Sequence, residues 1–303
     1  MGIPYSRGSE AGRPAIDHDA CSSCGDCVEA CPVGVLRLEG GRVLVERDAV
    51  FGCIACAQCM MVCATGAATV SGRGMEGARL VDLPPAGFRA NAEQLRALLV
   101  ARRSVRRFSR EQVPRETLDR VIAAAALAPM GIPPWDIGVV AFHGRDKVAR
   151  LARDVADTYR GLLRFLDNPL GRGLLRIFAS RTTYRQMVDF ILPLGREIVR
   201  GAAHGHDKVL YDAPAALLFH ASPWSDGTDA FIACTYAMLA AEAEGLGTTM
   251  IGCAAPPLAR RRAVLAAYGL PAKSVPKIVL VLGFPDVRYC RAIERPFDTV
   301  LFH

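Results

Sequence analysis

This chain of 303 residues contains the stretch CSSCGDCVEACP, residues 21–32, and repeats its cysteine spacing in CIACAQCMMVCA, residues 53–64. Both stretches follow the pattern C-x2-C-x2-C-x3-C, and each cysteine of the second lies 32 positions after its counterpart in the first. Four cysteines packed this tightly do not form the two separated pairs that a zinc site uses. The spacing is instead that of the ligands to a pair of iron–sulfur clusters.

The fourth cysteine of each run is expected to cross over to the other cluster. In a two-cluster arrangement, three thiolates of one run bind one cubane and the fourth binds the other. We therefore expect one [4Fe-4S] cluster to be held by Cys21, Cys24, Cys27 and Cys63, and the second by Cys53, Cys56, Cys59 and Cys31. The short spacers leave backbone amides free to donate to the sulfur atoms, which helps to set the potential.

The residues around the two runs agree with a small cluster-binding domain. Apolar residues alternate on either side of Gly40-Gly41, which predicts a hairpin with a tight turn, and residues 15–16 and 68–70 are typical of short flanking strands. Residues 1–75 resemble a bacterial two-cluster ferredoxin over its full length. Because so small a module buries little apolar surface, the clusters are expected to supply much of its folding energy.

Composition limits the classes of partner. The chain carries a formal net charge of +7, yet residues 1–75 contain six Arg, no Lys and eight acidic residues, so the remainder carries +9. We see no basic-aromatic pattern for nucleic acid and no apolar run of roughly 18 residues for a membrane. The clustered arginines favour a phosphate-bearing cofactor, with an acidic electron-donor protein as the alternative. Cluster chemistry and further free cysteines indicate a reducing, cytoplasmic location.

A second domain follows a linker. Glycine and proline recur between residues 72 and 87, so we divide the chain into a cluster domain at 1–75, a linker at 76–90 and a larger domain at 91–303. In the larger domain the patterns predict helices and strands that do not form a regular βαβ series, and hence an α+β fold. Helices are expected at 93–102, 114–127, 147–159, 229–244 and 256–268, and strands at 137–142, 215–220, 248–251 and 277–283. Residues 160–205 are expected to be helical in pieces, either as a lid or as a solvated face.

Three segments of the larger domain carry chemistry. Residues 102–108 read RRSVRRF, residues 128–135 read APMGIPPW, and residues 245–253 read GLGTTMIGC. Alone, the first would read as a solvated basic turn, although guanidinium groups also bind phosphate through paired hydrogen bonds. Taken in order, with Gly283-Phe284-Pro285 and a basic tail, they resemble the nitroreductase family of FMN enzymes over residues 91–303.

The resemblance implies where FMN binds. The segment with Arg102, Arg103, Ser104 and Arg106 would hold the phosphate and ribityl chain, together with Arg291. The backbone of Ile251, Gly252 and Cys253 would face the flavin N5, and Pro134 belongs to the loop beside the ring. That loop is shorter than in many family members, so backbone groups are expected to replace side-chain contacts. The family also implies a homodimer with FMN at the subunit interface.

Joining the two modules predicts an oxidoreductase. Electrons from a low-potential donor protein such as ferredoxin would pass through two [4Fe-4S] clusters to FMN and on to a small organic acceptor, a nitro compound, a quinone or an activated double bond. The reverse direction of electron flow is a variant of this hypothesis. The alternatives are an electron-transfer subunit without a substrate of its own and a cysteine-rich zinc protein.

Overall fold

The computed structural model describes residues 12–46, 52–75, 78–131 and 136–302. Contacts divide the chain into two compact units. The first unit extends to residue 89 and also includes residues 129–138 and 221–229, whereas the second contains the rest. The main break at residue 89 therefore falls at the end of the expected linker. The finer division into 1–75, 76–90 and 91–303 stays a prediction.

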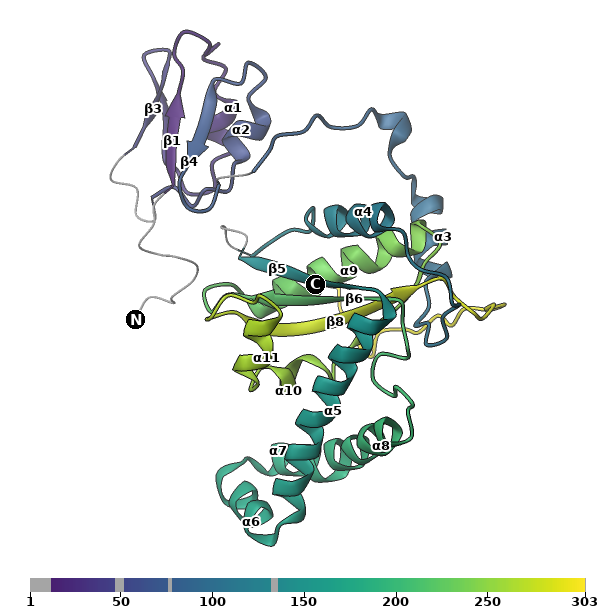
Figure 1. Ribbon diagram of the computed structural model, residues 1–303. Helices are drawn as coiled ribbons and strands as arrows, with labels where there is room; N and C mark the ends of the chain where they lie inside the picture. The colour runs from purple at the N-terminus through teal and green to yellow at the C-terminus, as the bar shows by residue number, and fades with distance from the viewer. Residues whose placement is uncertain (1–11, 47–51, 76–77, 132–135, 303) are drawn as a thin grey trace. The chain divides into compact units, whose positions relative to one another are not determined.

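The cluster domain is built from two short sheets and two single-turn helices (Figure 1). Strands β1 and β4 pair antiparallel with Arg13 opposite Ser71, and β2 and β3 form a hairpin with Leu36 opposite Val45. Gly40 and Gly41 have φ values of 56° and 77°, which confirms the tight turn between them. The bounds of these elements are β1 Arg13–Ile16, α1 Asp26–Glu29, β2 Leu36–Glu39, β3 Arg42–Val45, α2 Gln58–Val62 and β4 Ala68–Ser71.

The larger domain is built around a central four-stranded sheet with the strand order β5-β6-β8-β7 (Figure 1). All seven residues of β6 are buried, as its largely apolar sequence, interrupted only by His220, predicts. The elements are the 3-10 turn η1 Ala86–Phe88, α3 Ala92–Ala101, α4 Arg115–Ala125, β5 Ile137–His143, α5 Arg145–Asp167, α6 Pro169–Phe178, α7 Arg181–Arg185, the π-helix η2 Gln186–Ile191, α8 Leu192–Ala203, β6 Ala215–Ala221, α9 Gly227–Ala243, β7 Gly247–Ile251, α10 Ala255–Leu258, α11 Arg262–Ala267 and β8 Val275–Gly283.

The core packs α5, α10 and α11 against one face of this sheet. Alternate strand residues Ala216, Leu218, Val279 and Val281 point to that face and join one apolar cluster with Val148, Leu151, Val155, Leu258 and Leu265 of the helices. The apolar residues of helix α9 are spread around its circumference, and they are buried on one side and exposed at Phe231, Ile232 and Tyr236. Its residue Cys234 is fully buried, and burial raises the pKa of the thiol to about 12.

Two predicted helices differ from those observed. Helix α5 continues to Asp167, beyond the expected end at residue 159. The helix expected at 256–268 is instead two helices, α10 and α11, separated at Arg261, whose φ of −102° and ψ of 64° are not helical. This break lets Arg261 donate to Thr158 on α5, while Arg262 donates to the carbonyl oxygen atoms of Ala272 and Ser274.

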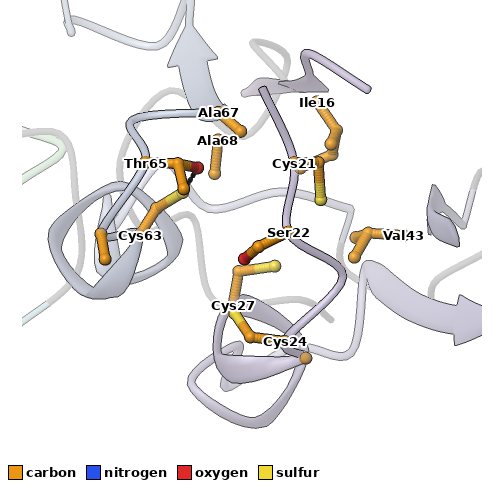
Figure 2. A pocket seen from close by; sticks show the side chains of 12 residues that line it. Ile16, Cys21, Ser22, Cys24, Cys27, Val43, Cys63, Thr65, Ala67 and Ala68 are labelled. Atoms are coloured by element: carbon orange, nitrogen blue, oxygen red, sulfur yellow. Dashed lines mark hydrogen bonds between the residues drawn. The ribbon is translucent and has the colours of Figure 1, made fainter. Parts of the chain in front are cut away.

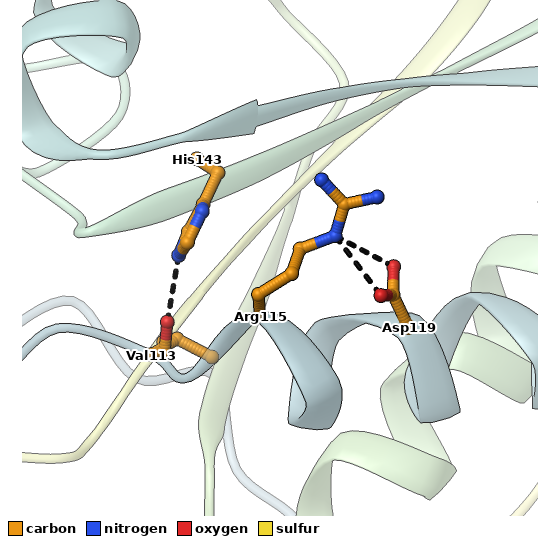
Figure 3. Close-up of polar contacts among 4 residues, drawn as sticks. All are labelled: Val113, Arg115, Asp119 and His143. Atoms are coloured by element: carbon orange, nitrogen blue, oxygen red, sulfur yellow. Dashed lines mark hydrogen bonds and ion pairs between the residues drawn. The ribbon is translucent and has the colours of Figure 1, made fainter.

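The start of α4 is tied to the end of β5 (Figure 3). Nε2 of His143 lies 2.7 Å from the carbonyl oxygen of Val113, and because a carbonyl can only accept, this nitrogen carries the proton. Arg115, the first residue of the helix, pairs with Asp119 one turn later at 2.8 Å. Pro114 has a ψ of 144° and precedes the helix, so α4 begins one residue later than predicted.

The arginine-rich segment after α3 lies along the edge of the sheet formed by β7 and β8. The amide of Val105 donates to the carbonyl of Thr248 at 2.9 Å, and the amide of Ser109 donates to that of Phe284 at 2.9 Å. Val105 is buried against Gly247, where a Cβ atom would lie only 2.5 Å from a Val105 methyl group. Glycine at 247 therefore permits the close approach that fixes the segment in place.

None of the helices in the described part of the chain combines the length and the hydrophobicity that crossing a bilayer requires.

We expect Gly247→Ala to lower the free energy of unfolding by about 1–3 kcal/mol, because its methyl group would overlap the buried Val105 side chain. The matched control is Gly173→Ala in α6, where an added Cβ meets nothing within 4 Å. Thermal unfolding of both variants measures the effect. An unchanged midpoint for Gly247→Ala would show that Val105 does not hold the segment tightly.

Candidate functional site

Two cavities in the cluster domain each bring four cysteines together. Cys21, Cys24, Cys27 and Cys63 line the first, with the side chains of Ile16 and Val43 beside them (Figure 2). Cys31, Cys53, Cys56 and Cys59 line the second. These are the two crossed sets expected from the sequence, since Cys63 and Cys31 each lie with the first three cysteines of the other run.

The backbone around the two cavities has the same local geometry. The amide of Ser23 lies 3.4 Å from Sγ of Cys21, and the amide of Ala55 lies 3.4 Å from Sγ of Cys53. Both donors have left-handed backbones, with φ values of 60° and 57°. Left-handed backbone at residues with a side chain is unfavourable and is retained where the surroundings enforce it. The short spacers thus turn amides toward the sulfur atoms, as the spacing predicts.

The thiols are electrostatically coupled in the same two sets. Burial, with smaller contributions from Cys53, Cys56 and Cys31, raises the pKa of Cys59 to about 11. Burial likewise raises the pKa of Cys27, with Cys21, Cys24 and Cys63 adding to the effect. Thiolates gathered in this way repel one another, and a cationic metal centre offsets that repulsion.

Cys63 differs from the other perturbed thiols. Burial acts to raise the pKa of Cys63, but the hydroxyl of Thr65, 3.6 Å away, and nearby backbone amides outweigh it and lower the pKa (Figure 2).

Among the described residues, no three His, Cys, Asp or Glu side chains are close enough to bind a single ion. A four-iron cluster binds each thiolate at a different iron, so wider spacing suits it better than zinc.

The arginine-rich segment presents alternate residues to solvent. Val105 is buried, whereas Ser104 and Arg106 on either side of it are exposed and Arg102 is half-buried. The segment meets β7 at one bridge, between Ser104 and Thr248. Nη1 of Arg102 lies 3.8 Å from Sδ of Met238, and Cζ of Arg106 lies 5.9 Å from the ring centre of Tyr211. Guanidinium groups and a hydroxyl this close in the chain form a donor set suited to a phosphate ester. Arg107 pairs with Asp286 at 3.3 Å.

The end of β7 and the tail carry the other residues that the resemblance assigns to the flavin site. Ile251 is buried, Gly252 is exposed and Cys253 is half-buried, so the backbone becomes accessible where the strand ends. The hydroxyl of Tyr289 donates to the carbonyl of Ser104 at 3.3 Å, which places the tail beside the segment. Arg291, two residues further, is exposed, and Pro134 lies outside the described residues.

Tyr159 was not found by sequence reasoning. Its hydroxyl, on α5, donates to the carbonyl of Cys253 at 2.9 Å and so holds the end of β7. Burial, followed by the nearby Cys253, raises the pKa of Tyr159, and the hydroxyl therefore keeps its proton for this bond. The helical spacing of apolar residues in α5 indicates that Tyr159 is buried, but nothing in the sequence indicates its partner 94 positions away.

Comparison with known proteins defines the class. Residues 99–284 match the family model "Nitroreductase family", and residues 20–68 match that of a "4Fe-4S dicluster domain". A ferredoxin of Methanothermococcus thermolithotrophicus is 40% identical over 57 residues, 18% of this chain and 92% of the relative. A ferredoxin-like protein of Azotobacter chroococcum is 39% identical over 54 residues, 16% of this chain and 78% of the relative.

Solved structures support the fold. A nitroreductase from Bacteroides fragilis, crystallised with bound FMN, superimposes with a TM-score of 0.54 at 20% identity, covering 71% of this chain and all of that protein. Fold and sites together define an oxidoreductase that carries a ferredoxin-like iron–sulfur domain, as the sequence predicts. The chain belongs to the nitroreductase family. The predicted α+β fold and the predicted class of FMN-dependent oxidoreductase are confirmed.

Paired substitutions test the crossed cysteine sets. If Cys27 and Cys63 bind the same cluster, Cys27→Ser with Cys63→Ser removes one cluster and leaves about half of the iron. The combination of Cys27→Ser with Cys31→Ser damages both sets and is expected to leave little iron. Iron content of anaerobically purified protein measures the difference. The reverse order of iron content would contradict the crossed assignment.

Proposed function

We propose that this protein takes electrons from a low-potential donor protein, such as a ferredoxin, and delivers them in pairs to a small organic acceptor. Two [4Fe-4S] clusters, bound by the crossed cysteine sets, supply single electrons, and FMN supplies hydride transfer to a nitro, quinone or activated double-bond acceptor. The observation that carries the proposal is the presence of two four-cysteine cavities in the same chain as a nitroreductase domain.

The described residues fit FMN. Arg102, Arg103, Ser104 and Arg106 of the edge segment, with Arg291 in the tail that Tyr289 holds beside it, are suited to a phosphate and a ribityl chain. The exposed backbone at Gly252 allows a flat ring to approach closely. The Bacteroides fragilis protein of similar fold contains FMN, which supports the same cofactor here.

The chain's own groups hold this site rigid. The carbonyl of Val105 accepts a hydrogen bond from the Thr249 hydroxyl, and the amide of Val105 donates to the carbonyl of Thr248. These two bonds hold the proposed phosphate-binding segment in register with the sheet. Tyr159 fixes the carbonyl of Cys253, next to the exposed Gly252. Burial raises the pKa of the Cys253 thiol, which therefore stays neutral and adds no negative charge beside a reduced ring.

We further propose a homodimer with FMN at its interface. Helix α9 exposes Phe231, Ile232 and Tyr236, whereas Ala230, Ala233 and Cys234 are buried. The tail from residue 289 exposes a further set of apolar side chains, Ile293, Phe297, Val300, Leu301 and Phe302. Apolar surface on this scale is typical of subunit contacts. The cytoplasmic location stays a prediction.

Anaerobic titration with dithionite tests the proposed function. Purified protein should show flavin bands over a broad iron–sulfur absorption and bleach after about four electrons per chain, one for each cluster and two for the flavin. Cluster absorption without flavin, unchanged after FMN is added, would favour the electron-transfer subunit instead. Turnover with NAD(P)H equal to or faster than turnover with reduced ferredoxin would contradict the proposed donor.

Substitution of one arginine tests the phosphate site. Arg102→Gln removes a charge-assisted hydrogen bond and is expected to weaken FMN binding about tenfold. Arg107→Gln is the matched control, because Arg107 already pairs with Asp286. Dissociation constants for FMN, measured by flavin fluorescence on protein stripped of FMN, should separate the two variants. Equal affinities would place the phosphate elsewhere.

A further inference from the structure

A large cavity lies between the helical segment of residues 160–205, called the insertion below, and the end of β7. Its volume is about 530 Å³, within the usual range for a small-molecule site. Residues of α5, of η2 and of the segment after β7 form its wall: Thr158, Tyr159, Gly161, Leu162, Phe165, Met187, Ile191, Gly252, Cys253, Pro256, Pro257 and Arg260. Gly252 and Cys253 are the residues expected beside the flavin, so the cavity opens onto the proposed site of hydride transfer.

The polar groups of this wall are already engaged, with one exception. The Tyr159 hydroxyl donates to the Cys253 carbonyl, and the Thr158 hydroxyl accepts from Arg261 at 3.4 Å. Arg260 is exposed, and in the described part of the chain its guanidinium has neither an ion pair nor a hydrogen bond. It is also the one charged residue among the twelve named above. The wall is thus largely apolar, and Arg260 is its one charged group without a partner among the described residues.

The insertion around the cavity carries a net positive charge, the same sign as Arg260. Residues 160–205 contain eight arginines and three acidic residues. Two of these acids already form ion pairs within the insertion, Asp167 with Arg196 and Glu197 with Arg200. A surface of this sign concentrates anions near the cavity mouth and disfavours cations.

We propose that this cavity is the acceptor site and that it selects a flat, largely apolar acceptor bearing one carboxylate or comparable anionic group, held by Arg260. The apolar side chains of Leu162, Phe165 and Ile191 would cover the body of the molecule, and the guanidinium would bind its anionic end through charge-assisted hydrogen bonds. This inference rests on the proposed function, because it names the substrate class of the same site.

Binding of two matched probes to the oxidised holoprotein tests the proposal. 4-Nitrobenzoate and its methyl ester have the same ring and nitro group and differ in charge. We expect the carboxylate to bind about tenfold more tightly than the ester in calorimetric titrations. Arg260→Gln should remove this preference by weakening the carboxylate about tenfold while leaving the ester within about twofold. Arg176→Gln, an exposed insertion arginine outside the wall, is the charge control and should retain the preference.

Filling the cavity tests its location independently of charge. An added Cβ at Gly161 meets nothing within 4 Å, so Gly161→Leu extends a side chain into the cavity without overlap at its base. Because glycine is a poor helix former, the variant is expected to fold. It should weaken both probes about tenfold or more, whereas Gly173→Leu, at an equally open helical position outside the wall, should weaken neither.

The possible results separate this inference from the proposed function. Flavin content and the dithionite titration report on the function without either probe. If these agree with the proposal but the ester binds as tightly as the carboxylate, or neither probe binds, or Gly161→Leu has no effect, the inference is overturned alone. If FMN fails to bind but the expected order of affinities persists, the anion-selective cavity stands and the proposed function falls.

Discussion

Two sets of four cysteines must each surround one small cavity, and the fold of the first domain follows from that requirement. The two runs come from separate loops, and Cys31 and Cys63 each exchange places to complete the other set. Two short sheets and two single-turn helices provide little apolar burial of their own. Burial and mutual repulsion raise the pKa of Cys27 and Cys59, so we expect cluster binding to stabilise the folded domain.

The larger domain depends on a comparable fixed contact. The segment around Val105 pairs with β7, and the glycine at 247 lets the two backbones approach closely. That contact sets which residues of the segment face outward, and Tyr159 fixes the far end of the same strand. One strand therefore connects the proposed phosphate site, at its start, to the proposed flavin-facing backbone and the cavity at its end. Residues of the long helical segment and of the chain after that end line the cavity together.

Much of this was predictable from local patterns. The repeated cysteine spacing, read with the two-cluster arrangement that it indicates, predicted the two crossed sets, and Gly40-Gly41 predicted the hairpin from residues close in the chain. The sequence also predicted the strands and most of the helices. It missed the break at Arg261, which is stabilised by contacts with Thr158 and Ser274 rather than by any local signal. The cavity and the Tyr159–Cys253 bond were equally invisible, because they join helix, insertion and strand across long separations. Pro134, predicted beside the ring, lies outside the described residues.

The central claim is that electrons pass from the clusters to the flavin of the same protein. Flash photoreduction of the clusters, followed by the absorbance of the flavin, measures this transfer directly. The account predicts flavin reduction as a first-order process whose rate does not change over a tenfold or so dilution of the protein, and which slows when Cys27 and Cys63 are both replaced by Ser. A rate proportional to protein concentration, or one insensitive to loss of a cluster, would contradict it.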